Sequence, residues 1–198
     1  GAEKIMLGED PAAIPLGTAV PAQDKNKGQD HADWPQFLGP SRSGTIPDAG
    51  LATDWTANPP RLLWRQPVGA GWAGFAVSAE IAVTQEQRGD EERVMAYDLR
   101  TGRPLWSHAD KARHDSALGS EGPRAVATID AGQVFALGAT GLLNALDLAT
   151  GRRLWSRDIL QDSEGGEPSW GVAVSPLVRG DHVIVSAGGT SGRALAAY

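Results

Sequence analysis

The residues best suited to chemistry are few in this chain, and their spacing restricts what they can do. The four histidines, at positions 31, 108, 114 and 182, lack the His-x-x-x-His spacing of a metal-binding helix. There is no cysteine, so disulfides, thiolate metal sites and a thiol nucleophile are excluded from these 198 residues. We therefore assign no catalytic residue and no metal site from the sequence.

Two acidic runs leave a calcium site open as an alternative. Asp90-Glu91-Glu92 and the stretch from Asp162 to Glu167 supply carboxylate oxygens, which calcium prefers as ligands. Neither run has the spacing of a known calcium loop, and the tips of hairpins are commonly charged. Solvated loops are the interpretation that we prefer for both runs.

Gly69-Ala-Gly71-Trp-Ala-Gly74 matches the glycine pattern of a dinucleotide-binding loop. Such a loop must open a helix whose N-terminus faces the pyrophosphate. The following residues, 75–83, instead alternate between apolar and small or polar types, which is typical of a strand. We interpret 69–74 as a loop leading into a sheet. Together with loops 109–122 and 160–170, it is where we would first look for a binding site.

Composition favours short strands over long helices. The chain contains 25 glycines and 13 prolines, both of which destabilise helices. Its formal net charge of −6, without a basic stripe, speaks against a nucleic-acid partner. No apolar run reaches the roughly 18 residues of a membrane-spanning helix, and no signal peptide is visible after Gly1-Ala2.

An eleven-residue pattern occurs twice, 49 residues apart, at 96–106 and 145–155. Both copies read Ala-x-Asp-x-x-Thr-Gly-x-x-Leu-Trp, and a third begins at Ala197-Tyr198. The Asp carboxylate can accept hydrogen bonds from N–H groups two or three residues on, and the glycine permits a positive φ. The pattern therefore predicts a hairpin whose returning strand presents a large tryptophan surface to a neighbour.

The repeat predicts an all-β fold of four-stranded antiparallel units that stack as the blades of a β-propeller. In the first unit we expect strands near 73–78, 81–86, 93–98 and 103–108. In the second we expect them near 123–130, 133–138, 142–147 and 152–158. A third unit is expected near 171–178, 182–187 and 192–198, without a fourth strand.

These units divide the chain into a flexible tail (1–32), an extended lead-in (33–59) and propeller blades (60–198). Leu63-Trp64 resembles a fourth strand standing alone, so we predict a closing strand that completes the last blade of a ring. On this interpretation the chain is an N-terminal fragment of about three blades from a seven- or eight-bladed propeller. The parts of the blade region are the closing strand at 60–67, blades at 72–109 and 123–159, and an incomplete blade at 170–198.

The motif resembles the tryptophan-docking motif of the pyrroloquinoline-quinone (PQQ) propeller repeat, over roughly residues 60–198. The segment from Trp34 to Gly44 is similar to one that opens many PQQ-like repeat proteins of bacteria. The resemblance implies that Trp106 and Trp155 dock between adjacent blades. It also implies a set of residues that form the hairpins and the turns on which these tryptophans rest: Ala96, Asp98, Thr101, Gly102, Ala145, Asp147, Thr150 and Gly151.

The family contains two functional classes, and the motif does not choose between them. Quinoprotein dehydrogenases oxidise alcohols or sugars with PQQ and usually calcium. Other members have no cofactor, including the lipoprotein that scaffolds outer-membrane protein assembly. PQQ would need a flat slot and cationic donors for its carboxylates, for which the candidates are Trp72, Trp170 and Arg124. The cysteine pair that often caps this slot is missing.

We expect a non-catalytic interaction scaffold of the bacterial periplasm or cell envelope, or a secreted one, with other envelope proteins as partners. The alternative is a PQQ-dependent alcohol or sugar dehydrogenase. Blades outside these residues that carried a cysteine pair and a calcium ligand set would favour the alternative.

Overall fold

The computed structural model describes residues 33–46, 50–117, 119–189 and 192–198. The tail predicted at 1–32 lies outside the described residues. The described part forms two four-stranded sheets, one three-stranded sheet and a two-stranded hairpin. The first sheet contains β1 (Ala76–Ser78), β2 (Ile81–Arg88), β3 (Glu91–Asp98) and β4 (Pro104–Asp110). The second contains β7 (Thr128–Asp130), β8 (Gln133–Leu137), β9 (Leu142–Asp147) and β10 (Arg153–Asp158). The third contains β11 (Leu177–Arg179), β12 (His182–Ser186) and β13 (Leu195–Ala197).

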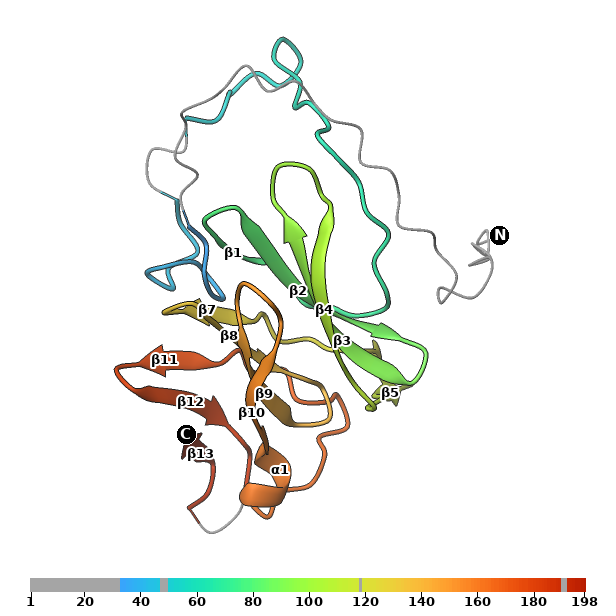
Figure 1. The fold of residues 1–198 in the computed structure, drawn as a ribbon, viewed down its shortest axis with the longest axis vertical. Coiled ribbons are helices and arrows are strands. Elements are labelled where there is room, and N and C mark those ends of the chain that lie inside the picture. The colour runs from blue at the N-terminus through green and yellow to red at the C-terminus, as the bar shows by residue number, and fades with distance from the viewer. Residues whose placement is uncertain (1–32, 47–49, 118, 190–191) are drawn as a thin grey trace.

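Each sheet is an antiparallel meander in which strands pair in the order of the chain. Successive sheets stand next to one another, from the green sheet to the yellow and orange one and then to the red one (Figure 1). The prediction of four-stranded propeller blades is confirmed, and the main strands lie within a few residues of their expected positions. Tight turns connect consecutive strands, so each strand can pair with the next one along the chain, and this produces the observed order.

The sequence did not predict two small elements in the loops between blades. A hairpin of β5 (Asp115–Ser116) and β6 (Ser120–Glu121) follows β4. A one-turn helix, α1 (Ile159–Asp162), follows β10 and begins where the Asp158 side chain accepts hydrogen bonds from two backbone N–H groups. The fold is therefore nearly all-β rather than entirely so.

Residues 60–67, predicted as a closing strand, belong to no sheet of the described chain. Side chains hold this segment instead. Trp64 Nε1 donates to the carbonyl of Leu99 at 2.8 Å, and Gln66 Nε2 donates to the carbonyl of Gly102 at 2.9 Å. The closing strand stays a prediction, because it was expected to pair with the last blade of a ring and not with the three sheets described.

The lead-in hydrogen-bonds to the first strand of the first and second sheets and to the residue just before the first strand of the third. Trp34 exchanges two backbone hydrogen bonds with Val77 of β1, at 2.8 and 2.9 Å. The carbonyl of Pro35 accepts from Ile129 N of β7 at 2.7 Å. Arg42 Nη2 donates to the carbonyl of Pro176, just before β11, at 2.9 Å. This segment, blue in Figure 1, therefore ties the blades together along one edge.

The core lies between neighbouring sheets rather than inside any one of them. Alternate residues of a strand point to opposite faces of its sheet. Both faces of the second sheet are buried, one against the first sheet and the other against the third. One apolar cluster joins it to the first sheet, and its buried members are Ala76, Val83, Val94, Ala96, Ala127, Ile129, Val134, Ala136 and Leu146. The other joins it to the third sheet and includes Phe135, Leu137, Leu143, Val183 and Val185. The described part of the chain has no helix with the length and apolarity needed to cross a bilayer.

Candidate functional site

The two copies of the repeated motif form the same hairpin turn. In the first, Asp98 Oδ1 accepts from Thr101 N and Thr101 Oγ1, both at 2.8 Å. In the second, Asp147 Oδ1 accepts from Thr150 N at 2.9 Å and Thr150 Oγ1 at 2.6 Å. The following glycines have φ values of +70° and +72°, a backbone conformation that is strained for a residue with a side chain.

These hydrogen bonds lower the pKa of both aspartates. Burial alone would raise the pKa of Asp98, but the donors from Thr101 and Arg100 outweigh it. At Asp147 the hydrogen bond from the Thr150 hydroxyl is the main cause. Both turns are therefore stabilised most strongly when their carboxylates are ionised.

A tryptophan from the preceding segment rests on each turn. Trp106 Nε1 donates to the carbonyl of Leu148 at 2.8 Å, and a Cβ on Gly151 would lie 2.5 Å from the indole. Trp64 makes the same two contacts with Leu99 and Gly102, at 2.8 and 2.5 Å. In the sequence, Trp64 matches only the Leu-Trp end of the motif, so this contact was not predicted.

Trp155 lies in a different environment. Its ring packs against Phe135 and Tyr198, with centroids 6.0 and 6.4 Å away. It borders a groove of about 540 Å³ between the second and third sheets, which Arg157, His182 and Tyr198 also line. Of these three tryptophans, Trp64 and Trp106 thus lie against a glycine turn of the motif.

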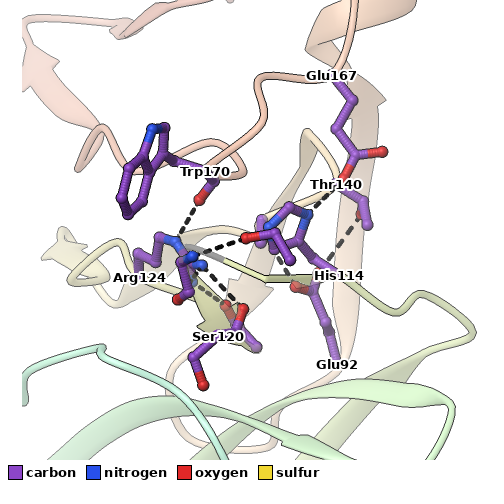
Figure 2. A network of polar contacts seen from close by, with 11 residues as sticks. Glu92, His114, Ser120, Arg124, Thr140, Glu167 and Trp170 are labelled. Carbon is purple, nitrogen blue, oxygen red and sulfur yellow. Dashed lines mark hydrogen bonds and ion pairs between the residues drawn. The ribbon is translucent and has the colours of Figure 1, made fainter.

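The candidate loops 69–74, 109–122 and 160–170 meet at one end of the blades. Arg124 joins two of them, because its guanidinium donates to the carbonyls of Gly119, Ser120, Gly122 and Trp170 (Figure 2). Loop 69–74 joins through Trp72 N, which donates to the carbonyl of Pro123 at 2.8 Å. Arg124 is the residue that fastens this loop cluster.

A buried histidine makes a second link between the same loops. His114, 4% exposed, lies 2.5 Å from Glu167 Oε1 through Nδ1, while its buried Nε2 has no hydrogen-bond partner in the described chain (Figure 2). Nearby, the buried Glu92 accepts from Ala139 N at 2.9 Å. Burial is the main cause that raises the pKa of Glu92, since a carboxylate in a dry environment loses its hydration.

Trp72 and Trp170 point outward from this cluster, with exposures of 69% and 55%. It is the backbone carbonyl of Trp170 that accepts a hydrogen bond from Arg124 (Figure 2). Exposed tryptophans on either side of Pro123-Arg124 give the loop cluster an aromatic surface. Large apolar side chains on an exposed surface are typical of sites that contact another molecule.

These residues do not fit a quinone site within the described chain. PQQ would need cationic donors for its carboxylates, yet the Arg124 guanidinium is engaged by four backbone carbonyls. A flat slot would also enclose its tryptophan, whereas both rings are more than half exposed. The interpretation of Trp72, Trp170 and Arg124 as a quinone slot is therefore not supported by their geometry.

The two acidic runs do not gather into loop sites for calcium. Glu91 pairs with Arg93 at 2.6 Å near the surface, while Glu92 points into the contact between blades. In the second run Asp162 accepts from the Tyr198 hydroxyl, Glu164 pairs with Arg193, and Glu167 pairs with His114. The burial of Glu92 was not predicted, although this residue lies two positions before the apolar Val94 on the same strand face.

Comparison with known proteins gives a family match over most of the chain. Residues 42–198 match the family model described as outer membrane protein assembly factor BamB, a model of PQQ-like repeats. A comparison with curated protein sequences gave no match.

Three solved structures are similar in part. Quinohemoprotein alcohol dehydrogenase from Comamonas testosteroni is 24% identical with a TM-score of 0.44, over 60% of this chain and 17% of that one. Europium-containing methanol dehydrogenase is 19% identical with a TM-score of 0.47, over 63% and 22%. BamB from Moraxella catarrhalis is 20% identical with a TM-score of 0.39, over 57% and 29%. The chain thus spans less than a third of each of these proteins.

Proposed function

Since this chain belongs to the PQQ-like propeller family whose model describes the outer membrane protein assembly factor BamB, we propose that it is a non-catalytic scaffold of the bacterial periplasm or cell envelope. Its role is to bind other envelope proteins. The tryptophan contacts of the motif hold neighbouring blades together, and the loop cluster around Arg124 presents the binding surface.

The engagement of Arg124 carries this proposal. A cofactor site would need that guanidinium free for a ligand, whereas here it fastens three loop carbonyls and the Trp170 backbone. The exposed rings of Trp72 and Trp170 are left as the prominent features of the cluster. Exposed tryptophans on a backbone that is held in place by hydrogen bonds are suited to protein recognition, because aromatic side chains dominate binding energy at interfaces.

Site-specific photo-cross-linking in the cells that make the protein tests this proposal. The photoreactive residue p-benzoylphenylalanine replaces Trp72 or Trp170 in the full-length protein, and Trp55 serves as the control. Trp55 is 59% exposed but lies outside the loop cluster. We expect adducts with an envelope protein, identified by mass spectrometry, from positions 72 and 170 and none from position 55. Equal adducts from all three positions would contradict the proposed surface.

Equilibrium dialysis of PQQ with calcium against the full-length protein tests the alternative of a quinoprotein dehydrogenase. The scaffold proposal expects no saturable binding. One-to-one binding at micromolar concentration or tighter would overturn it, and alcohol and sugar oxidation would become the next assay.

A further inference from the structure

Strands β4 and β10 and the segment 60–67 repeat one pair of residues beside their tryptophans. An arginine stands three positions before each tryptophan and a leucine directly before it, which gives Arg61 and Leu63, Arg103 and Leu105, and Arg152 and Leu154. All three arginines are exposed. The three leucines are exposed by 47%, 37% and 39% in chain order, although leucine is a residue of the interior. We call these six residues the arginine–leucine rim.

A β-bulge accounts for the exposed leucine in each four-stranded sheet. The residues on either side of Leu105 pair with successive residues of β3, so Leu105 itself has no partner. The residues on either side of Leu154 pair in the same way with β9, so Leu154 has no partner. A bulge kinks its strand and re-aims a side chain. The exposure of these leucines is therefore a feature that both blades share.

The tryptophan contacts bring successive pairs of the rim close together. Trp64 lies against Gly102, which directly precedes Arg103. Trp106 makes the same contact with the glycine that directly precedes Arg152. Each leucine is therefore followed along the rim by the arginine of the next copy. Because equivalent residues of propeller blades recur at one level around the axis, such a rim can contact a flat partner.

The rim is positively charged in a chain whose formal net charge is −6. Its three arginines form no ion pair within the part of the chain that the structure describes. Arg65 and Arg100, also exposed, stand beside the rim in the chain, and Arg100 lies 3.9 Å from Glu80. Asp98 and Asp147 attract the rim arginines at longer range, but their carboxylates accept hydrogen bonds within their own turns. The rim guanidinium groups are thus available to an anionic partner.

We propose that the arginine–leucine rim binds the anionic surface of a phospholipid membrane. A guanidinium binds a phosphate through two parallel hydrogen bonds, and a leucine beside it is buried where the headgroups meet the acyl chains. A lipid leaflet presents many identical phosphates in one plane. This repetition matches a rim that carries the same pair of residues in successive copies, whereas an acidic peptide would need only one such pair.

The rim and the loop cluster lie at opposite ends of the first blade. Strand β4 begins at Pro104, next to the rim, and ends at Asp110, within the loop 109–122. Its length separates the two ends by roughly 20 Å. A membrane contact at the rim would therefore leave the loop cluster open to protein partners. The inference goes beyond the proposed scaffold function and does not depend on it.

Co-sedimentation of the full-length protein with lipid vesicles tests the proposal. One set of vesicles contains phosphatidylcholine alone, and the other contains equal parts of phosphatidylcholine and phosphatidylglycerol. At low salt we expect partition onto the mixed vesicles to be at least roughly tenfold stronger, and we expect about 0.5 M NaCl to abolish this difference by screening. Equal partition onto both sets, or none onto either, would overturn the proposal.

Matched double variants locate the contact. Arg103→Gln with Arg152→Gln removes two charges from the rim, and Arg179→Gln with Arg193→Gln removes two from exposed positions in the third sheet and the loop before β13. The rim variant should weaken partition onto the mixed vesicles about 20-fold, and the control variant by less than about twofold. Equal losses would show attraction by net charge alone and overturn the assignment. Both variants should keep the urea midpoint of the wild type, because all four arginines are exposed.

A leucine variant tests the apolar half of the rim. Leu105→Ala with Leu154→Ala should weaken partition roughly threefold or more but leave its salt dependence unchanged, because it removes buried apolar area and no charge. Unchanged partition would contradict the insertion of these leucines. If the arginine variant instead loses a cross-linked protein in cells while vesicles bind neither form, the rim binds an acidic protein and the membrane proposal is wrong.

Discussion

Trp106 and Trp155 hold the same position in the two copies of the motif, yet their surroundings differ. Trp106 rests on the Gly151 turn and donates to the carbonyl of Leu148. Trp155 packs on Phe135 and Tyr198 and borders a groove of about 540 Å³. The comparison teaches that the motif does not enclose its own tryptophan. The turn that covers Trp106 belongs to the next blade, so the contact is a property of two successive units.

The largest expected difference between the two regions is in stability. Trp106→Ala should lower the free energy of unfolding by about 3–5 kcal/mol, because it empties a contact between blades. In the 198-residue chain Trp155→Ala should lower it by about 1–2 kcal/mol, since there that ring borders a groove. Urea denaturation followed by circular dichroism measures both. Equal losses would contradict this difference and show that Trp155 is packed as tightly in solution as Trp106.

A glycine pair sharpens the comparison at the turn itself. Gly151 and Gly132 both have positive φ, but a Cβ would meet Trp106 at 2.5 Å in the first and nothing within 4 Å in the second. Gly132→Ala should therefore cost about 1–2 kcal/mol from backbone strain alone. Gly151→Ala should cost about 1–3 kcal/mol more, because the methyl group displaces the indole.

A double variant checks the cause of that extra loss. Combining Gly151→Ala with Trp106→Ala should remove the clash. The double variant should therefore lose less stability than the sum of the losses of the two single variants. Additive losses, measured in the same urea titrations, would place the indole away from the turn.

The smallest expected effect is a pH dependence of the motif turns. The folded pKa values of Asp98 and Asp147 lie below the ordinary value. Their stabilisation is therefore complete above the unfolded pKa of about 3.9 and is lost as pH falls through the folded pKa. Asp98→Asn and Asp147→Asn should each be less stable than the wild type at neutral pH. In both variants the difference should shrink as the solution is acidified below about pH 4.

Urea midpoints between neutral and acidic pH measure this effect, and threonine variants serve as its control. Thr101→Val and Thr150→Val remove the hydroxyl donors but keep the carboxylates. They should move the acid transition toward higher pH, because the depressed pKa values return toward normal. An unchanged acid transition in all four variants would show that these turns do not contribute to acid stability.

Much of the fold was predictable because its signals are local. Period-two alternation and turn residues located the strands of all three sheets. The Asp-x-x-Thr-Gly spacing predicted a hairpin, and the structure has that turn at both Asp98 and Asp147. The closing strand expected at 60–67 stays a prediction, because its expected partner lies in a blade other than the three described. The hydrogen bonds of Trp34 to Val77 and of Arg42 to Pro176 had no signal in the sequence, because they join residues far apart in the chain.

The candidate site was predictable only in outline. Loops 69–74, 109–122 and 160–170 could be named from the sequence, since loops between blades commonly carry function. The sequence presented Arg124 as a free cation and Glu92 as part of a solvated run. Tertiary contacts assign Arg124 to backbone carbonyls and Glu92 to the interior, and neither environment follows from the residues beside them in the chain.

By itself, the sequence determined the repeat, the strands and the turn chemistry, because these depend on side-chain alternation and hydrogen bonds across a few residues. Only the tertiary structure decided which polar groups are satisfied, which tryptophans are covered, and that Glu92, Asp110 and Asn144 surround one small cavity. The physical reason is distance along the chain. Burial and electrostatics in the contacts between blades arise from residues roughly 35 to 50 positions apart, which come together only when complete sheets stack.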